Sequence, residues 1–99
     1  MKSLLDDLHD EARAELAAAI RLRRRLHESP ELGVVLPETQ RAVLEALGDL
    51  DVEIETGGAT SAVVATLRGA TPGPTILLRA DMDALPMKEE TGLAFASQH

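Results

Sequence analysis

The sequence predicts an α/β protein in which two helices pack on a partial mixed sheet of about three strands. Residues 4–26 and 37–47 carry apolar side chains at intervals of three and four, which is typical of helices that bury one face. Residues 51–56, 61–69 and 75–80 are short segments rich in aliphatic side chains, with glycine and proline between them. The predicted order is therefore helix, helix and then three strands.

The first predicted helix runs from Leu4 to Leu26. Ser3 and Asp6 have the spacing of an N-terminal cap, and Pro30 ends the helix because the residue before a proline avoids helical backbone angles. Acidic residues come first and arginines last, as the helix dipole favours. The predicted buried stripe consists of Leu5, Leu8, Ala12, Leu16, Ala19, Ile20 and Leu26.

The second predicted helix begins at Pro37, because proline fits the first helical position. Gly48 suits its end. Its buried stripe is predicted to contain Val43, Leu44 and Leu47.

The three predicted strands differ in expected burial. Residues 51–56 alternate apolar and acidic side chains, as a half-exposed edge strand does, and residues 61–69 follow as the second strand. Residues 75–80 are apolar except for Arg79 and Thr75, which indicates a strand covered on both faces. Two helices are too few to cover both faces, so residues 1–99 are expected to be the front part of a larger domain.

Composition narrows the class of protein. The 17 acidic and 10 basic residues give a formal charge of −7, which disfavours binding to nucleic acid and to anionic membranes. There is no cysteine, so a thiolate metal site cannot form within the chain. No apolar run approaches the roughly 20 residues that span a bilayer, and the N-terminal residues do not have the pattern of a signal peptide. The expectation is a soluble, cytoplasmic protein.

Asp81 and Asp83 are the main candidates for chemistry. They lie two residues apart at the predicted carboxyl end of the third strand, so both side chains face the same way. Such a pair can hold a cation, orient a metal-bound histidine or act in acid–base catalysis. The structural alternative is that Asp81 pairs with Arg79 and that Asp83 caps the turn before Pro86.

The histidines and glycines give weaker signals. His27 lies at the end of the first helix, where a charged imidazole is favoured, so a structural role is the first interpretation and contact with a ligand the second. His9 lies among acidic residues on the solvated side of the helix, and His99 is terminal. Gly57 and Gly58 precede a strand rather than a helix, which is the wrong context for binding phosphate.

Three blocks, taken together, point to a family. They are "RRRLHESPELGVVLPETQ" (23–40), "GGATSAVVATLRG" (57–69) and "ILLRADMDALPMKEETGLAFASQH" (76–99). In this order they resemble the amidohydrolase branch of the aminoacylase and carboxypeptidase metallopeptidases, which includes hippurate hydrolase-like and indole-acetyl-amino-acid hydrolase-like enzymes. The matching positions of the first block are Arg24, Arg25, Leu26, His27, Pro30, Glu31, Leu32, Glu38 and Thr39.

The resemblance implies the front part of a three-layer catalytic domain and, in the complete protein, hydrolysis of the amide bond of N-acyl amino acids or small peptides with two zinc or manganese ions. It implies that Asp83 stands behind a metal-binding histidine and fixes its orientation. Asp81 falls where sister branches place that histidine, and it is the second candidate.

The other parts of the family site are expected outside residues 1–99. The metal ligands, the catalytic glutamate and the dimerisation domain belong to this group, so a homodimer is expected only of the complete protein. The chain alone is accordingly expected to supply no metal ligand, to bind zinc weakly and to leave amides intact.

Two alternatives come from other classes. An aliphatic strand that ends in Asp-x-Asp also resembles the first motif of haloacid-dehalogenase-type phosphatases, in which Asp81 would be the nucleophile beside a magnesium ion. A small non-catalytic interaction module is the second alternative, because a half-covered sheet leaves an open edge.

Overall fold

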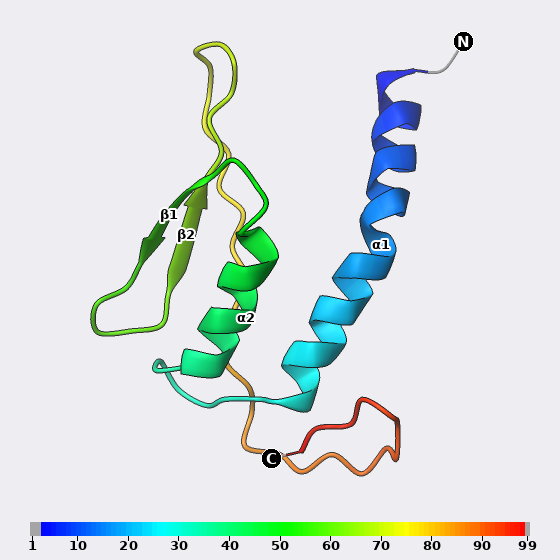
Figure 1. Cartoon of the computed structure of the whole chain (residues 1–99), viewed down its shortest axis with the longest axis vertical. Helices are drawn as coiled ribbons and strands as arrows, with labels where there is room; N and C mark the ends of the chain where they lie inside the picture. The colour runs from blue at the N-terminus through cyan, green and yellow to red at the C-terminus, as the bar shows by residue number, and fades with distance from the viewer. Residues whose placement is uncertain (1–2, 99) are drawn as a thin grey trace.

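The computed structural model describes residues 3–98, and within them two helices are followed by two strands (Figure 1). The elements are α1 (Leu4–Glu28), α2 (Pro37–Leu47), β1 (Glu53–Thr56) and β2 (Val63–Thr66). The mixed α/β class and both helices are confirmed. His99 lies outside the described residues.

Helix α1 has the predicted ends but not the predicted burial. The Ser3 hydroxyl accepts from the Asp6 amide at 3.2 Å, and the Asp6 carboxylate accepts from the Ser3 amide at 3.3 Å, which confirms the cap. No side chain of α1 is buried, and Leu5 is 70% exposed. The half-buried apolar positions are Ile20, Leu22 and Leu26, all in the second half of the helix. The first half of the predicted stripe therefore has no packing partner in the structure.

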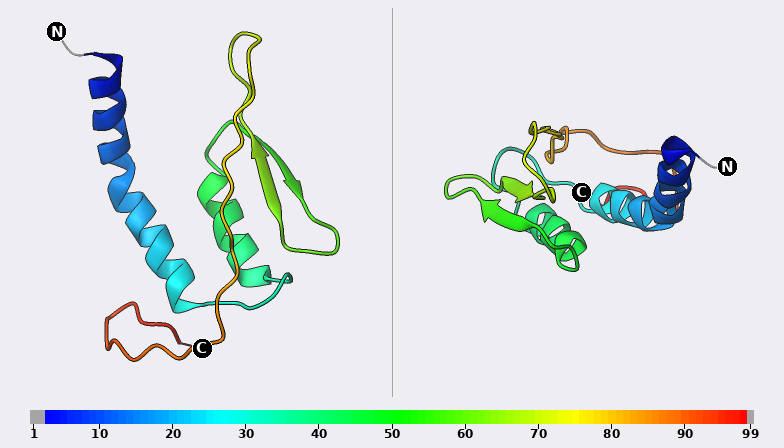
Figure 2. Two further views of the ribbon diagram at one scale, coloured as in Figure 1. Left: turned by 180° about the vertical axis from the view of Figure 1, so that it is seen from behind. Right: turned by 90° about the horizontal axis from the view of Figure 1, so that it is seen from above.

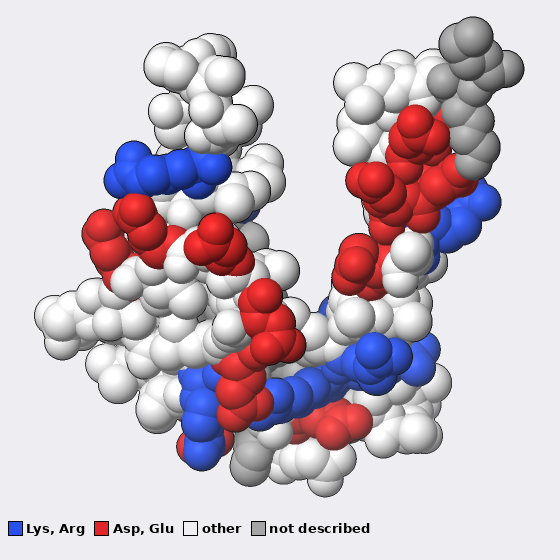
Figure 3. Space-filling view, turned by 45° about the horizontal axis from the view of Figure 1, so that its top comes forward, with Lys and Arg blue, Asp and Glu red and all other residues white. Residues whose placement is uncertain are grey.

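The two halves of α1 differ in charge as well as in packing. Acidic residues crowd the first half and arginines the second half, which follows the expected complement to the helix dipole (Figure 3). In the second half, Arg25 donates to the Glu45 carboxylate of α2 at 2.7 Å. Hydrogen bonding from Arg25 and its charge lower the pKa of Glu45.

Helix α2 is the centre of the small core. It begins at Pro37 and ends at Gly48 as predicted. Leu36, Thr39 and Ala42 are buried, while the predicted stripe of Val43, Leu44 and Leu47 is half-buried. The helix contacts both α1 and β2, and α1 does not reach the sheet (Figure 2). Among the described helices and strands, α2 is therefore the element that contacts both α1 and the sheet.

The sheet has two antiparallel strands. Their register runs from Glu53 opposite Thr66 to Thr56 opposite Val63. Arg68, just after β2, donates to the Glu53 carboxylate of β1 at 2.7 and 3.1 Å, and this pair lowers the pKa of Glu53. A cross-strand ion pair of this kind fixes the ends of a short ladder.

The predicted third strand at 75–80 is wrong, and the sheet is not mixed. The segment is extended but belongs to no sheet of the described chain, and Ile76, Leu77 and Leu78 are 84%, 84% and 91% exposed. A strand needs a neighbour for its backbone N–H and C=O groups, and residues 3–98 bring none to this segment. The apolar composition of residues 75–80 indicates that the segment is suited to burial. Composition alone does not provide the neighbouring strand that it needs.

The molecule is open rather than compact. Its radius of gyration is 16.4 Å, whereas a compact domain of this length has about 13 Å. Helix α1 diverges from α2 towards its N-terminus, and residues 85–98 fold back against its C-terminal end (Figures 1 and 2). Within residues 3–98, no helix combines the length and apolar character that a bilayer crossing needs.

Candidate functional site

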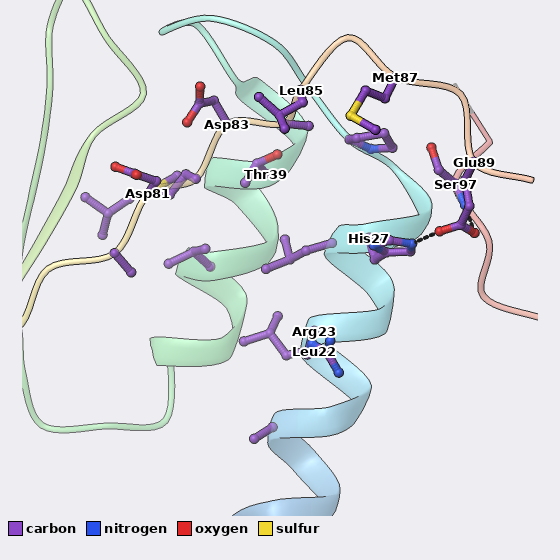
Figure 4. Close-up of a pocket in the computed structure, with 18 of the residues that line it drawn as sticks. Leu22, Arg23, His27, Thr39, Asp81, Asp83, Leu85, Met87, Glu89 and Ser97 are labelled. Carbon is purple, nitrogen blue, oxygen red and sulfur yellow. Dashed lines mark hydrogen bonds and ion pairs between the residues drawn. The ribbon is translucent and has the colours of Figure 1, made fainter. Parts of the chain in front are cut away.

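An open groove of about 980 Å³ lies between the two helices and the segment 78–89 (Figure 4). Apolar side chains form most of its wall, and a few charged side chains stand at its rim. The charged members are Arg23, His27, Asp81, Asp83, Lys88 and Glu89. The groove therefore contains both candidate aspartates and the histidine of the first helix.

Asp81 forms an ion pair with Arg79, as the structural alternative predicted. Arg79 donates to the Asp81 carboxylate at 2.7 Å, and both side chains are largely exposed. Such an exposed pair contributes little to stability, about 0–1 kcal/mol. The predicted pairing of Asp81 with Arg79 is confirmed. Because both side chains are exposed, each of them can also pair with another group.

Asp83 is also exposed, and the described structure gives its carboxylate no hydrogen bond or ion pair. It therefore does not cap the turn before Pro86, contrary to what the structural alternative predicted. Asp81 and Asp83 were predicted to lie at the carboxyl end of a strand at 75–80, and this strand is not formed in the described residues. Both carboxylates nevertheless line the same groove.

The described residues do not fit a metal centre by themselves. Among residues 3–98, no three His, Cys, Asp or Glu side chains gather closely enough to hold an ion. Two carboxylates suit a divalent cation chemically, but a zinc ion in a protein takes three or four protein ligands. His27 adds none, because it lies with Glu89 on the opposite side of the groove from Asp81 and Asp83 (Figure 4).

His27 instead forms a contact that the sequence did not predict. Its Nε2 bonds to the Glu89 carboxylate, which also accepts from the Thr91 hydroxyl at 2.9 Å and the Ser97 amide at 3.2 Å. The hydrogen bond from His27 is the main reason that the pKa of Glu89 is lowered. This contact agrees with the structural interpretation of His27, and a contact of His27 with a ligand stays a prediction. Its partner lies 62 residues away, and no local spacing signals a contact of that range.

Three further contacts hold residues 85–98 against the end of α1. The Arg24 guanidinium lies 4.3 Å from the centre of the Phe95 ring, and the Gln98 amide donates to the Glu28 carbonyl at 2.9 Å. The His27 ring meets Phe95 edge-on at 6.2 Å. We refer to residues 85–98 as the returning loop.

Glu31 connects the aspartate segment to α2. Its carboxylate accepts from the amides of Thr39 at 2.6 Å and Glu38 at 3.3 Å, which satisfies two free N–H groups of the helix start. Its backbone carbonyl accepts from the Ala84 amide at 2.8 Å. One residue therefore fixes both the first turn of α2 and the segment that follows Asp83.

Ser61 makes a comparable link between α2 and the sheet. Its buried hydroxyl accepts from the Leu36 amide at 2.6 Å, and its own amide donates to the Val34 carbonyl at 2.8 Å. Ser61 lies just before β2, so these bonds place the sheet against the start of α2. Neither Glu31 nor Ser61 was assigned such a role from the sequence.

Comparison with known proteins shows to which proteins the chain is similar. It matches carboxypeptidases and deacetylases of N-acetylated amino acids at 37–46% identity, which confirms the resemblance inferred from the three sequence blocks. No family model matches the chain. No solved structure matches it either.

Three relatives illustrate the match. Thermostable carboxypeptidase 1 of Saccharolobus solfataricus is 45% identical over 96 residues, which are 96% of this chain and 24% of the relative. N-acetyl-L-cysteine deacetylase of Bacillus subtilis is 41% identical over 80 residues, covering 81% of this chain and 19% of the relative. N-acetyldiaminopimelate deacetylase of Oenococcus oeni is 43% identical over 84 residues, covering 81% and 22%. The chain thus spans about a fifth to a quarter of the length of these relatives.

The phosphatase alternative gains no support from these findings. The strand end at which it places Asp81 is not formed in the described residues, and the amidohydrolase interpretation places both aspartates at that same strand end. The three relatives named above carry carboxypeptidase and deacetylase names.

Proposed function

We propose that this chain forms one wall of the active site of a metal-dependent amidohydrolase, whose complete form cleaves N-acyl amino acids or small peptides. The observation that carries the proposal is the identity of 41–46% to carboxypeptidases and deacetylases across most of the chain. The names of these relatives suggest the substrate class, an acyl group joined by an amide bond to an amino acid. Asp81 and Asp83 line the same open groove, which agrees with both belonging to one active site.

In this proposal Asp83 is a positioning residue. Its carboxylate is exposed and has no partner among the described residues, so it is available to accept a hydrogen bond from a metal-binding side chain. Two zinc or manganese ions would activate water when bound, and their ligands would come from residues other than 3–98. Asp81 has the lesser role, since Arg79 already neutralises its charge.

A chimera tests the proposal. The matching segment of thermostable carboxypeptidase 1 is replaced by the 96 aligned residues of this chain, and release of the C-terminal amino acid from a small peptide is measured. We expect an active chimera in which Asp83→Asn lowers metal affinity or activity by about 10–100-fold, as loss of a ligand-orienting partner does. Asp49→Asn, an exposed change outside the groove, serves as the matched control and should leave activity unchanged. An active chimera that tolerates Asp83→Asn contradicts the role of Asp83.

The chain by itself is expected to be inactive. Purified chain is incubated with N-acetyl amino acids and zinc or manganese, and released amine is measured. No release is expected, because the described residues supply fewer ligands than a zinc ion needs. A parallel assay with magnesium and an aryl phosphate examines the phosphatase alternative, and hydrolysis that Asp81→Asn abolishes would favour it.

A further inference from the structure

Glu31 forms hydrogen bonds at two different places, one through its side chain and one through its backbone. The carboxylate accepts from the Thr39 amide at 2.6 Å and from the Glu38 amide at 3.3 Å, both in the first turn of α2. The carbonyl accepts from the Ala84 amide at 2.8 Å. Thr39 and Asp83 line the same groove (Figure 4). Glu31 therefore connects the helix that holds the core to the residue that follows Asp83.

The bond from Ala84 acts on Asp83 through the peptide group that joins the two residues. A peptide group is planar, and its plane contains the Cα atoms of both residues as well as the N–H group. When the Glu31 carbonyl fixes the direction of the Ala84 N–H, it also fixes the plane in which the Asp83 Cα lies. This restrains the backbone from which the Asp83 carboxylate extends.

The other end of this connection is well packed. The amides at the start of a helix have no acceptor within the helix and favour a negative charge, so a carboxylate binds them firmly. Thr39 is 5% exposed, and Ala42, one turn further on, is 3% exposed. Glu31 itself is half-buried. The Glu31 carboxylate is thus anchored on the small core of the molecule.

Position matters for a carboxylate that orients a metal-binding side chain. Such a group must be held within about 0.5 Å of its productive geometry, and a displacement of about 1 Å can cost roughly 100-fold in rate. The Asp83 carboxylate makes no hydrogen bond or ion pair with another group of residues 3–98. Within this part of the chain, its position is therefore determined by the backbone that carries it.

We propose that Glu31 is a positioning residue of the active site, which holds the Asp83–Ala84 peptide against the start of α2 and thereby places the Asp83 carboxylate. This inference rests on the proposed function, because it gives a link within the fold a role in the reaction. The alternative is a helix cap that stabilises α2 and leaves Asp83 unaffected. The two roles differ in what changes when the Glu31 carboxylate is removed.

Hydrogen exchange of the 99-residue chain tests the physical link and does not depend on the proposed function. Exchange of the Ala84 amide is followed by NMR, and the Gly57 amide, which donates to the Ala62 carbonyl, is the internal reference for global unfolding. Glu31→Ala should accelerate exchange at Ala84 by about fivefold or more relative to Gly57, because loss of the cap allows local opening. Equal acceleration at both amides, or none at Ala84, overturns the inference.

A double-mutant cycle tests the functional role in the carboxypeptidase chimera described above. Zinc affinity is measured by titrating the metal-free chimera, and kcat and KM by release of the C-terminal amino acid. Glu31→Ala should lower zinc affinity or kcat by about tenfold with KM nearly unchanged, and Glu31→Gln, which keeps an acceptor for α2, should recover most of the loss. In the Asp83→Asn background Glu31→Ala should have no further effect, because residues that act through one another are not additive.

Glu11→Ala, the same change at an exposed position of α1, is the matched control and should leave zinc affinity and kcat unchanged. A chimera that is sensitive to Asp83→Asn but tolerates Glu31→Ala contradicts this inference and leaves the proposed function standing. Equal losses from Glu31→Ala with and without the Asp83 carboxylate also contradict it, since Glu31 would then act on another group. A chimera that tolerates Asp83→Asn refutes the proposed role of Asp83, and this inference falls with it.

Discussion

Glu31 shows how a single side chain can replace a missing helix cap. The residue at the cap position of α2 is Leu36, which has no side chain acceptor, so the amides of Glu38 and Thr39 depend on a carboxylate from outside the helix. Glu31 provides it across the loop in which Gly33 adopts a positive φ of 86°. That conformation suits glycine and brings the chain back towards the helix start.

Replacing Glu31 by alanine is expected to destabilise the chain by about 1 kcal/mol, the usual cost of losing a helix cap. Urea denaturation followed by circular dichroism measures the change. Glu31→Gln keeps an acceptor and should lose less than alanine does. Glu28→Ala is the control, because the contact of that residue with the returning loop uses its backbone carbonyl. Equal stability of Glu31→Ala and wild type would show that the cap is dispensable.

Individual residues also show which features could be predicted from the sequence and which could not. The ends of both helices could be predicted because Ser3, Pro30, Pro37 and Gly48 act through neighbouring residues. The contact of His27 with Glu89 could not, because it depends on how a distant loop returns. The pairing of Arg79 with Asp81 lay within reach, since the two residues are separated by one position.

At the scale of elements, the carboxylate of Glu89 joins the returning loop to α1 and also organises the loop internally. Glu89 accepts bonds from His27, Thr91 and Ser97, and the bond from His27 lowers its pKa below the ordinary value of 4.5. A lowered pKa means that the folded form favours the ionised carboxylate. The stabilisation is therefore present above pH 4.5 and is lost as the pH falls through the lowered pKa.

The loop is accordingly expected to detach on acidification. The NMR shift of the Ser97 amide, which donates to Glu89, should titrate with a midpoint below pH 4.5. Glu89→Gln should abolish that titration, whereas Glu90→Gln should preserve it. A midpoint at or above pH 4.5 would contradict the inferred role of the His27–Glu89 bond.

The failed strand prediction also belongs to this scale. Helices form their hydrogen bonds within one segment, so local sequence largely determines where they begin and end. A strand depends on a neighbour from elsewhere in the chain, and residues 75–80 have none among the described residues. The antiparallel pair of β1 and β2 formed because a short connection joins them, across which the Gly57 amide donates to the Ala62 carbonyl at 3.0 Å.

At the scale of the whole molecule, the fold buries little. Among the described residues only Leu36, Thr39, Ala42 and Ser61 are buried, and α1 is attached through its second half alone. Hydrophobic burial is the dominant favourable term in folding, so a molecule with so small a core is marginally stable. The wall of the open groove and the exposed side chains of Ile76, Leu77 and Leu78 are among the apolar surfaces that remain.

The unfolding free energy of the chain should therefore depend only weakly on the urea concentration. The dependence of the unfolding free energy on urea scales with the surface exposed, so we expect a slope below the roughly 1–3 kcal/mol/M of compact small proteins. Small-angle scattering of the dilute chain should give a radius of gyration clearly above about 13 Å. A steep transition combined with a compact radius would show that the groove closes in solution.

The stacking of Arg24 on Phe95 has a practical consequence for spectroscopy. Phe95 is the chain's sole aromatic residue, since there is no tyrosine or tryptophan. Any aromatic ellipticity must then arise from this one ring, whose asymmetric surroundings are the guanidinium at 4.3 Å and the His27 imidazole. A fine-structured phenylalanine band would report docking of the chain's last stretch directly, without any label.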